Sequence, residues 1–234
     1  MCATCGCGES HEHEHERRTV KLEHDLLAKN DRIAAENRRA LGTRNVTVLN
    51  LIGSPGAGKT TLLERTIARL RPELALAVVE GDQATDRDAM RIKRAGGRSL
   101  QVNTGAGCHL DAEMVAEGLA ALAPERGSVV FVENVGNLVC PALFDVGERE
   151  KIVVMSVTEG DDKPLKYPHV FRAASRFVLT KIDLAPHVDF DIEACFARAR
   201  EINPRLATMR LSARSGEGMQ DWCSWVREQA APAS

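Results

Sequence analysis

The segment GSPGAGKT, residues 53–60, matches the pattern G-x-x-x-x-G-K-S/T at every defined position. Glycines in such a loop let backbone N–H groups close around phosphate oxygens, because no Cβ atom stands in the way. A helix that starts directly after the loop adds partial positive charge. The sequence therefore predicts a nucleotide phosphate site formed by Gly53, Gly56, Ala57, Gly58, Lys59, Thr60 and Thr61.

Lys59 and Thr60 carry the side chains that phosphoryl transfer requires. The lysine is expected to reach the β- and γ-phosphates, and the threonine hydroxyl to ligate Mg²⁺. Glu133 and Asp82 both follow apolar runs that are predicted strands. The carboxyl ends of parallel strands lie at the same edge of the sheet, so both acids would face the phosphate loop. The alternative for each acid is a solvated position in a surface loop. Gly136 lies where a glycine would sense the γ-phosphate. We predict catalytic roles for Lys59, Asp82 and Glu133, and Mg²⁺ ligation by Thr60 and Asp82.

Residues 180–183, with the sequence TKID, resemble the N-K-x-D motif that GTPases use to bind guanine. In that motif the aspartate accepts hydrogen bonds from guanine N1–H and the 2-amino group, a donor pair that adenine lacks. Asp183 would take this role, and Lys181 would lie along the plane of the base. Thr180 stands in place of the usual asparagine, which removes an amide that supports the phosphate loop.

A second loop points to the same base. Ser212 and Ala213 follow the last predicted strand and resemble the fifth GTPase motif, in which backbone N–H groups contact guanine O6. The alternative for residues 180–183 is a plain strand end at the surface. Together with the phosphate loop, the two motifs predict GTP and GDP as the ligands.

Cysteine and histidine are placed unevenly along the chain. Cys108 and His109 follow a Gly-rich loop, and Cys140 follows the segment that contains Glu133. Two thiolates and an imidazole suit Zn²⁺ or Ni²⁺, and three ligands leave one position of a tetrahedral site open. On residue types alone, the alternative that these cysteines are small buried side chains stays open. Cys195 and Cys223 lie within apolar helical patterns and are predicted to belong to the core.

The first 18 residues hold a further set of metal-binding side chains. Cys2, Cys5 and Cys7 could gather one ion, and if Met1 is removed the amine of Cys2 adds a nitrogen donor for a square-planar Ni²⁺ site. The segment also alternates histidine with glutamate, at His11, His13 and His15, which could hold a weaker ion. Because residues 1–18 are almost without apolar side chains, we expect a disordered tail unless a metal folds it.

The order of apolar runs predicts the fold. Buried strands are expected at Val46–Ile52, Leu74–Val79, Leu100–Asn103, Val129–Glu133, Ile152–Val157, Phe177–Lys181 and Ala207–Leu211. Helices are expected at Lys59–Leu70, Asp86–Ala95, Ala112–Ala123, Asp191–Ile202 and Met219–Gln229. This alternation implies an α/β P-loop NTPase fold with a mostly parallel, doubly wound sheet and helices on both faces. A leading helix is expected at residues 19–42 and the nucleotide-binding domain at residues 43–230.

Composition excludes several classes of protein. The chain has 234 residues, of which 44% are hydrophobic and 27% charged, as in ordinary globular proteins. Its formal net charge of −2 gives no electrostatic reason to bind nucleic acid or an anionic membrane. An apolar run of the ~20 residues that span a bilayer is missing, and the first residues do not form a signal peptide. Seven cysteines without such a signal indicate reduced thiols and a cytoplasmic protein.

The combined motifs resemble the HypB family, the nickel-inserting GTPases of nickel–iron hydrogenase maturation. The similarity covers essentially the whole chain and is carried by Cys2-x-x-Cys5-Gly6-Cys7, the His-rich tract, residues 53–60, Glu80-Gly81-Asp82, Cys108-His109, residues 133–137 (ENVGN) and Cys140-Pro141. The related UreG proteins carry a Cys-Pro-His metal motif that this chain lacks.

The resemblance implies more than the spacing shows. It implies a homodimer promoted by GTP and metal, with Ni²⁺ or Zn²⁺ bound at Cys108, His109 and Cys140 near the dimer interface. It implies tight Ni²⁺ binding at Cys2, Cys5 and Cys7. The partners that it implies are a HypA-type nickel/zinc accessory protein and the hydrogenase large subunit.

Cys140 lies seven positions beyond Glu133, on the segment that should move when the γ-phosphate is lost. We therefore expect metal affinity to depend on the nucleotide state. Neither an arginine finger nor a catalytic glutamine is evident, so slow intrinsic turnover is expected. Two alternatives stay open. One is a P-loop kinase or ATPase without guanine preference. The other is a nickel-storage or buffering protein whose nucleotide site is regulatory, although three histidines are few for storage.

Overall fold

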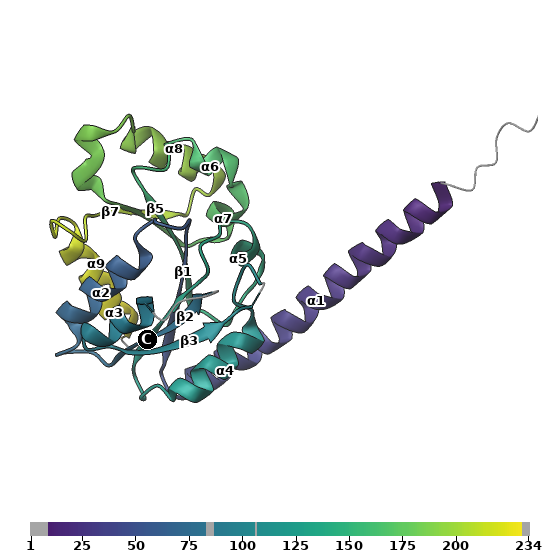
Figure 1. Cartoon of the computed structure of the whole chain (residues 1–234), viewed down its shortest axis with the longest axis horizontal. Coiled ribbons are helices and arrows are strands. Elements are labelled where there is room, and N and C mark those ends of the chain that lie inside the picture. The colour runs from purple at the N-terminus through teal and green to yellow at the C-terminus, as the bar shows by residue number, and fades with distance from the viewer. Residues whose placement is uncertain (1–8, 83–86, 106, 231–234) are drawn as a thin grey trace, which may run out of the picture.

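A sheet of seven parallel strands forms the centre of the fold in the computed structural model (Figure 1). The structure describes residues 9–82, 87–105 and 107–230, but not the side chains of residues 9–23, 82 and 87. The strand order across the sheet is β3-β2-β4-β1-β5-β6-β7. The strands are β1 (Thr47–Ile52), β2 (Leu76–Asp82), β3 (Arg98–Asn103), β4 (Val129–Glu133), β5 (Glu150–Ser156), β6 (Arg176–Thr180) and β7 (Ala207–Arg210). Each predicted strand is present, which confirms the α/β class.

Helices connect the strands and cover both faces of the sheet. They are α1 (Glu9–Thr43), α2 (Lys59–Leu70), α3 (Arg87–Arg94), α4 (Ala112–Leu122), α5 (Cys140–Leu143), α6 (Lys163–Lys166), α7 (Pro168–Ala173), the 3-10 helix η1 (Ile182–His187), α8 (Ile192–Ile202) and α9 (Met219–Ala230). The sequence missed α5, α6, α7 and η1, because helices of four to six residues do not show a helical period.

The leading helix begins earlier than expected. The sequence placed it at residues 19–42, whereas α1 starts at Glu9, so residues 9–18 are helical where a disordered tail was expected. Apolar spacing identifies only the part of a helix that packs on the protein, and in this chain that spacing begins near residue 20. A helix can continue beyond its packed part where the residues favour helix, as Glu and Arg do. Residues 1–8, with Cys2, Cys5 and Cys7, lie outside the described part of the chain.

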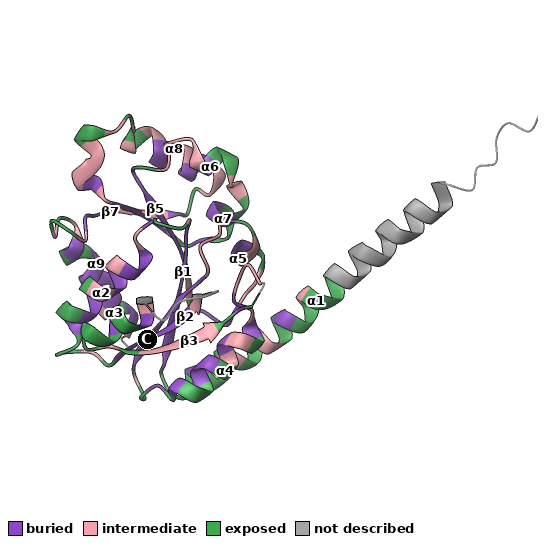
Figure 2. Ribbon diagram, in the orientation of Figure 1, coloured by how far each residue is buried: buried purple, intermediate pink, exposed green. Residues whose placement is uncertain are grey.

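Alternate residues of the strands pack on opposite faces. On one face Leu49 and Phe131 pack under α2, α3 and α9. On the other face Val48 and Val130 pack under α1 and α4, and Phe177 packs with α7 and α8. All six residues of β1 are therefore buried, as strands covered on both sides must be (Figure 2).

The two cysteines assigned to the core are buried there. Cys195 is fully buried on α8, and Cys223 is almost fully buried on α9. In the part of the chain with described coordinates, none of the helices combines the length and the apolar character needed to cross a bilayer.

A buried hydrogen bond joins the helix that follows the phosphate loop to α9. Trp222 Nε1 donates to Thr66 Oγ1 over 2.7 Å, and that hydroxyl donates to Leu62 O over 2.6 Å. Both side chains are fully buried. A Thr66→Val variant would leave the indole N–H without its acceptor, at a cost of about 1–3 kcal/mol in the free energy of unfolding.

Urea unfolding at constant m-value measures this loss. Thr66→Ser is the matched control, because it keeps the hydroxyl and removes one methyl group, worth about 1 kcal/mol. A Thr66→Val protein as stable as Thr66→Ser would show that this hydrogen bond does not hold α2 and α9 together.

Candidate functional site

The phosphate loop runs from the end of β1 to the first residue of α2. Gly58 has φ +95°, in the left-handed region that favours glycine. A Cβ atom on Gly53 would lie 2.3 Å from Val154 O, so the first loop position also requires glycine. Lys59 Nζ donates to Gly53 O over 3.0 Å and to Ser54 O over 3.3 Å. The loop is thus closed around its own lysine.

A cleft of about 630 Å³ opens in front of the loop, a volume typical of small-molecule sites. The predicted residues that line this cleft are Gly56, Gly58, Lys59, Thr60, Thr61, Glu133, Gly136 and Lys181. A Cβ atom on Gly136 would lie 2.7 Å from Pro55 Cγ, so the segment after β4 passes directly over the phosphate loop. Cys108 also lines the cleft, which places one metal-binding candidate on its wall.

Thr60 and Glu133 form a polar pair at the floor of the cleft. Thr60 Oγ1 donates to Glu133 Oε1 over 2.7 Å, and Glu133 Oε2 has no hydrogen-bond partner among the described residues. Burial raises the pKa of Glu133 to about 7, against the attraction of Lys59, and burial lowers the pKa of Lys59. A hydroxyl beside an unpaired carboxylate oxygen fits Mg²⁺, which prefers oxygen ligands.

Asp82 cannot be placed in this site as a side chain. Asp82 is the last residue of β2, which pairs directly with β4, so its backbone lies at the same carboxyl edge of the sheet as Glu133. Its side chain lies outside the described residues. Its Mg²⁺ and catalytic roles therefore stay predictions.

Thr180 supports the phosphate loop, which corrects the expectation from its place in the TKID segment. Its hydroxyl lies 2.5 Å from Ala57 O and 3.2 Å from Met155 O, and it donates toward these carbonyls. A threonine hydroxyl thus contacts the loop directly, where the usual asparagine would use its amide. Lys181 adds a second contact, since its Nζ donates to Gly56 O over 2.7 Å.

The residues predicted to bind the base lie beyond the carboxyl ends of β6 and β7. Asp183 is half-buried in the first turn of η1, and Ile182 N donates to Leu211 O over 3.4 Å, which joins the two strand ends. Ser212 and Ala213 follow β7, but the Ser212 amide already donates to Glu217 O over 2.9 Å. Asp183, Ser212 and Ala213 are not among the residues that line the 630 Å³ cleft.

Cys108, His109 and Cys140 come together as the sequence suggested. One ligand atom from each lies within 4.8 Å of the others, and the two Sγ atoms are 2.7 Å apart. Hydrogen bonding to Cys140, with burial, raises the pKa of Cys108, and burial lowers the pKa of His109. The lowered pKa favours the neutral form of the histidine, which can ligate a metal. The Cys108 thiol must release its proton when a metal binds. His109 also packs on Phe144, with ring centroids 4.0 Å apart.

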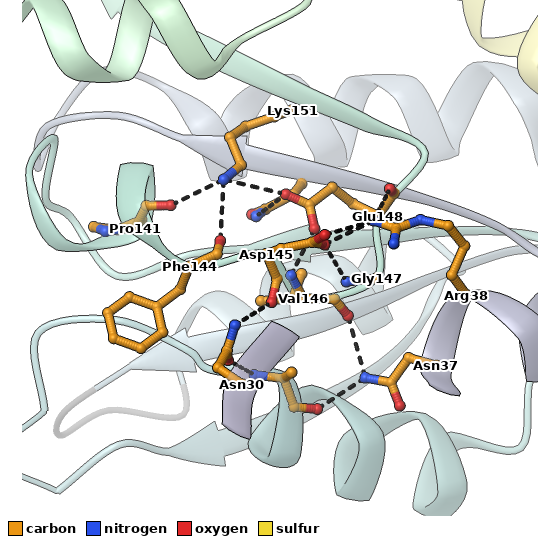
Figure 3. A network of polar contacts seen from close by, with 12 residues as sticks. Asn30, Asn37, Arg38, Pro141, Phe144, Asp145, Val146, Gly147, Glu148 and Lys151 are labelled. Atoms are coloured by element: carbon orange, nitrogen blue, oxygen red, sulfur yellow. Dashed lines mark hydrogen bonds and ion pairs between the residues drawn. The ribbon is translucent and has the colours of Figure 1, made fainter. Parts of the chain in front are cut away.

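Helix α1 holds the two metal-bearing segments in place. Asn30 Nδ2 donates to Asp145 O over 2.8 Å, while its Oδ1 accepts from Ala112 N over 2.9 Å (Figure 3). Asp145 follows the segment with Cys140, and Ala112 begins the helix after His109. On the other side, Lys151 Nζ donates to the carbonyls at the end of α5, including Phe144 O over 3.0 Å.

Several residues of the cleft were given no role from the sequence, although Asn134 and Asn137 belong to the ENVGN segment that carries the family resemblance. Asn134, Asn137, Asp88 and Arg91 all line the cleft. Arg91 sits on α3, where its Nη2 donates to Thr61 Oγ1 over 3.0 Å and to Glu64 Oε2 over 2.8 Å. Arginine beside a phosphate site was not expected, because α3 carries three basic residues in its last turn and the sequence does not distinguish them.

These features define a P-loop nucleotide-binding protein in which a group of two thiols and an imidazole, able to hold a metal ion, adjoins the cleft through Cys108. Residues 47–210 match the family model described as CobW/HypB/UreG, nucleotide-binding domain. The chain is 56% identical over 212 residues to the hydrogenase maturation factor HypB of Azotobacter vinelandii, covering 91% of this chain and 70% of that protein. The chain therefore belongs to the HypB family of hydrogenase maturation factors.

Solved structures agree with this assignment. The crystal structure of HypB from Archaeoglobus fulgidus matches with a TM-score of 0.82 at 38% identity, over 88% of this chain and 100% of that one. HypB from Helicobacter pylori, solved in complex with nickel, matches with a TM-score of 0.81 at 34% identity, over 86% and 95% of the two chains. The resemblance inferred from the motifs is confirmed.

The buried Glu133 predicts a pH dependence of stability. Its pKa rises from an ordinary 4.5 to about 7 on folding, so the folded state binds this proton more tightly than the unfolded state. The stabilisation is complete below pH 4.5 and is lost as the pH rises to about 7, a change of roughly 3 kcal/mol. Urea unfolding of the nucleotide- and Mg²⁺-free protein from pH 5 to pH 8 measures it. Glu133→Gln should lack this loss, so a stability difference between the two proteins that stays constant with pH would contradict the assignment.

Proposed function

We propose that this protein is a GTP-hydrolysing nickel metallochaperone, which inserts nickel into the large subunit of nickel–iron hydrogenase. The observation that carries the proposal is the shared position of Cys108. It lines the nucleotide cleft, and its Sγ atom belongs to the metal-binding group with His109 and Cys140. A ligand on the wall of a nucleotide site gives hydrolysis a direct way to change metal affinity.

Guanine selectivity is assigned to the loops after β6 and β7. Asp183 would accept from the N1–H and 2-amino groups of guanine, and an unpaired carboxylate would reject adenine. Lys181 reaches the phosphate loop at Gly56 and would cover the plane of the base. Because the Ser212 amide is used within its own loop, we assign the contact with O6 to the amide of Ala213.

Hydrolysis is assigned to the floor of the cleft. Lys59 would leave the loop carbonyls for the β- and γ-phosphates, and Thr60, with Glu133 and Asp82, would hold Mg²⁺, whose charge offsets that of the phosphates. Gly136 would sense the γ-phosphate. Arg91 is engaged by Glu64 and Thr61, so it would have to change partners to reach the nucleotide. We therefore expect slow intrinsic turnover.

Nickel is the cargo in this proposal, with Zn²⁺ as the other ion that the donor set fits. Three protein ligands leave a coordination position for a donor or acceptor protein. Val139 and Leu143 flank Cys140 and are 51% and 56% exposed, which supports a contact between two copies of the chain at this face. We propose that GTP and metal promote this homodimer.

The remaining assignments rest on the family. A HypA-type accessory protein and the hydrogenase large subunit are the proposed partners. Cys2, Cys5 and Cys7 are proposed as a second, tight nickel site. Free thiols at all these positions require a reducing compartment, so we propose the cytoplasm.

Base selectivity is the first test. Asp183→Asn turns an acceptor pair into an acceptor and a donor, and the donor suits the additional carbonyl of xanthine. We expect the wild-type protein to bind GDP at least about a hundredfold more tightly than ADP, and the variant to prefer XDP over GDP. Fluorescent-nucleotide competition measures both ratios. Equal affinity of the wild-type protein for ADP and GDP would favour a kinase or ATPase.

Metal coupling is the second test, made in a chain with Cys2, Cys5 and Cys7 replaced by alanine, so that nickel reports on the domain site. Nickel affinity is measured by competition with a chromophoric chelator, with GDP and with a non-hydrolysable GTP analogue. We expect the two affinities to differ by about 5- to 150-fold. Equal affinities in the two states would remove the coupling from the proposed function.

Two variants in the same background check the ligand assignment. Cys140→Ser should weaken nickel binding by at least about tenfold, because a thiolate ligand is lost. Cys223→Ala, a buried cysteine on α9, is the control and should bind nickel as before. Nickel binding unchanged by Cys140→Ser would show that the ion binds elsewhere.

A further inference from the structure

Asn137 contacts both segments that carry the metal-binding cysteines. Its Nδ2 donates to Cys108 O over 3.3 Å, and its Oδ1 accepts from Val139 N over 2.9 Å. Val139 is the residue before Cys140 and caps the N-terminus of α5. One half-buried amide therefore links two loops that are about thirty residues apart in the sequence.

The backbone of Asn137 is attached to the phosphate loop. Asn137 forms an isolated antiparallel bridge with Gly53, the first residue of that loop. The preceding residue, Gly136, packs so closely on Pro55 that a Cβ atom would lie 3.0 Å from Pro55 N. A displacement of the phosphate loop or of residues 136–137 therefore reaches the Asn137 side chain without an intervening flexible element.

We propose that Asn137 is the positioning residue that transmits the nucleotide state to the metal site. The inference rests on the proposed function, in which nickel affinity depends on the bound nucleotide. When residues 136–137 move, the amide pulls on Cys108 O and on Val139 N in different directions, so the separation and orientation of the two cysteine side chains change. Asn137 itself lies outside the set of metal ligands, so its removal should affect the coupling more than either binding site.

The second asparagine of the segment supports this route. Asn134 Oδ1 accepts from Leu110 N over 3.0 Å and from Val135 N over 3.1 Å. Leu110 directly follows His109, so the same segment after β4 also holds the third metal ligand. Asn134 is almost fully buried at the end of β4, which makes it the fixed point about which Asn137 can move.

Replacement by aspartate separates the two contacts of Asn137. Asn137→Asp keeps the acceptor for Val139 N and so preserves the local turn, but it loses the donor to Cys108 O. Asn137→Ala loses both contacts. Asn103→Ala is the matched control, because Asn103 Oδ1 accepts from Gly105 N over 2.8 Å in an equivalent two-residue turn of the loop before Cys108.

The measurement is the ratio of nickel affinities with GDP and with the GTP analogue, in the background without Cys2, Cys5 and Cys7. We expect the wild-type ratio to fall to about twofold or less in Asn137→Asp and Asn137→Ala, and to persist in Asn103→Ala. Nickel affinity in the GDP state and GTP-analogue affinity without metal are measured in the same variants, so that loss of either site is distinguished from loss of the ratio.

A spectroscopic readout accompanies the ratio. The thiolate-to-metal absorption band of the nickel-loaded wild-type protein should differ between the two nucleotides, and in Asn137→Asp it should be the same with both. A full wild-type ratio in Asn137→Asp, with the nucleotide-dependent band retained, would overturn the role of Asn137 while leaving the proposed function intact. A wild-type ratio of one would overturn the role of Asn137 and would also remove the coupling from the proposed function.

Discussion

Seven positions of chain separate the buried carboxylate of Glu133 from the thiol of Cys140, and the arrangement of the site depends on that short connection. Glu133 is fixed at the end of β4 by its hydrogen bond to Thr60. Cys140 is fixed at the start of α5, whose C-terminal carbonyls accept from Lys151. Seven residue steps span at most about 25 Å even when extended, and this segment also turns over Pro55. The segment thus connects the floor of the cleft to Cys140 while it packs on the phosphate loop.

Buried polar groups keep the surroundings of this segment rigid. Asn50 Nδ2 donates to Glu148 Oε1 over 3.3 Å, and Lys151 Nζ lies 3.5 Å from the same oxygen. Burial raises the pKa of Glu148, with Lys151 opposing the shift, so the pair is costly to bury and strongly destabilising to break. Asn30 on α1 ties the loop after Phe144 to α4. Because both ends of the segment between Glu133 and Cys140 are held by these contacts, any movement would be confined to the turn at Gly136 and to Asn137.

The sequence predicted the parts of this arrangement that local physics determines. Continuous apolar runs located the central strands, because a strand covered on both faces of a parallel sheet is buried along its whole length, as β1 and β4 are. The phosphate loop was recognisable because some of its positions have no room for a Cβ atom and therefore require glycine, as at Gly53. The residue types at Cys108, His109 and Cys140 indicated a soft metal. Their proximity could not be derived, because it depends on strand order, which sequence periodicity does not give.

Other features were hidden for the same reason. Thr180 departs from the guanine motif, yet its hydroxyl reaches Ala57 O, a compensation visible only once β6 and the loop are placed side by side. Arg91 contacts Thr61 and Glu64, and Asn137 contacts Cys108 O, about thirty residues away in each case, so the sequence alone assigned neither side chain a role. Helix α1 extends to Glu9 because propagation does not require the apolar spacing by which packed helices are recognised.

Strand order places the segment after β4 between the phosphate loop and the Cys108 loop. The phosphate loop follows β1 and the Cys108 loop follows β3, and the order β3-β2-β4-β1 places two strands between them. Three strand spacings of about 4.8 Å put these strand ends roughly 14 Å apart. The β4 end lies one spacing from β1 and two from β3, so a chain that leaves it can touch both. On that segment the Asn137 side chain offers both a donor and an acceptor, and it contacts Cys108 O on one side and Val139 N on the other.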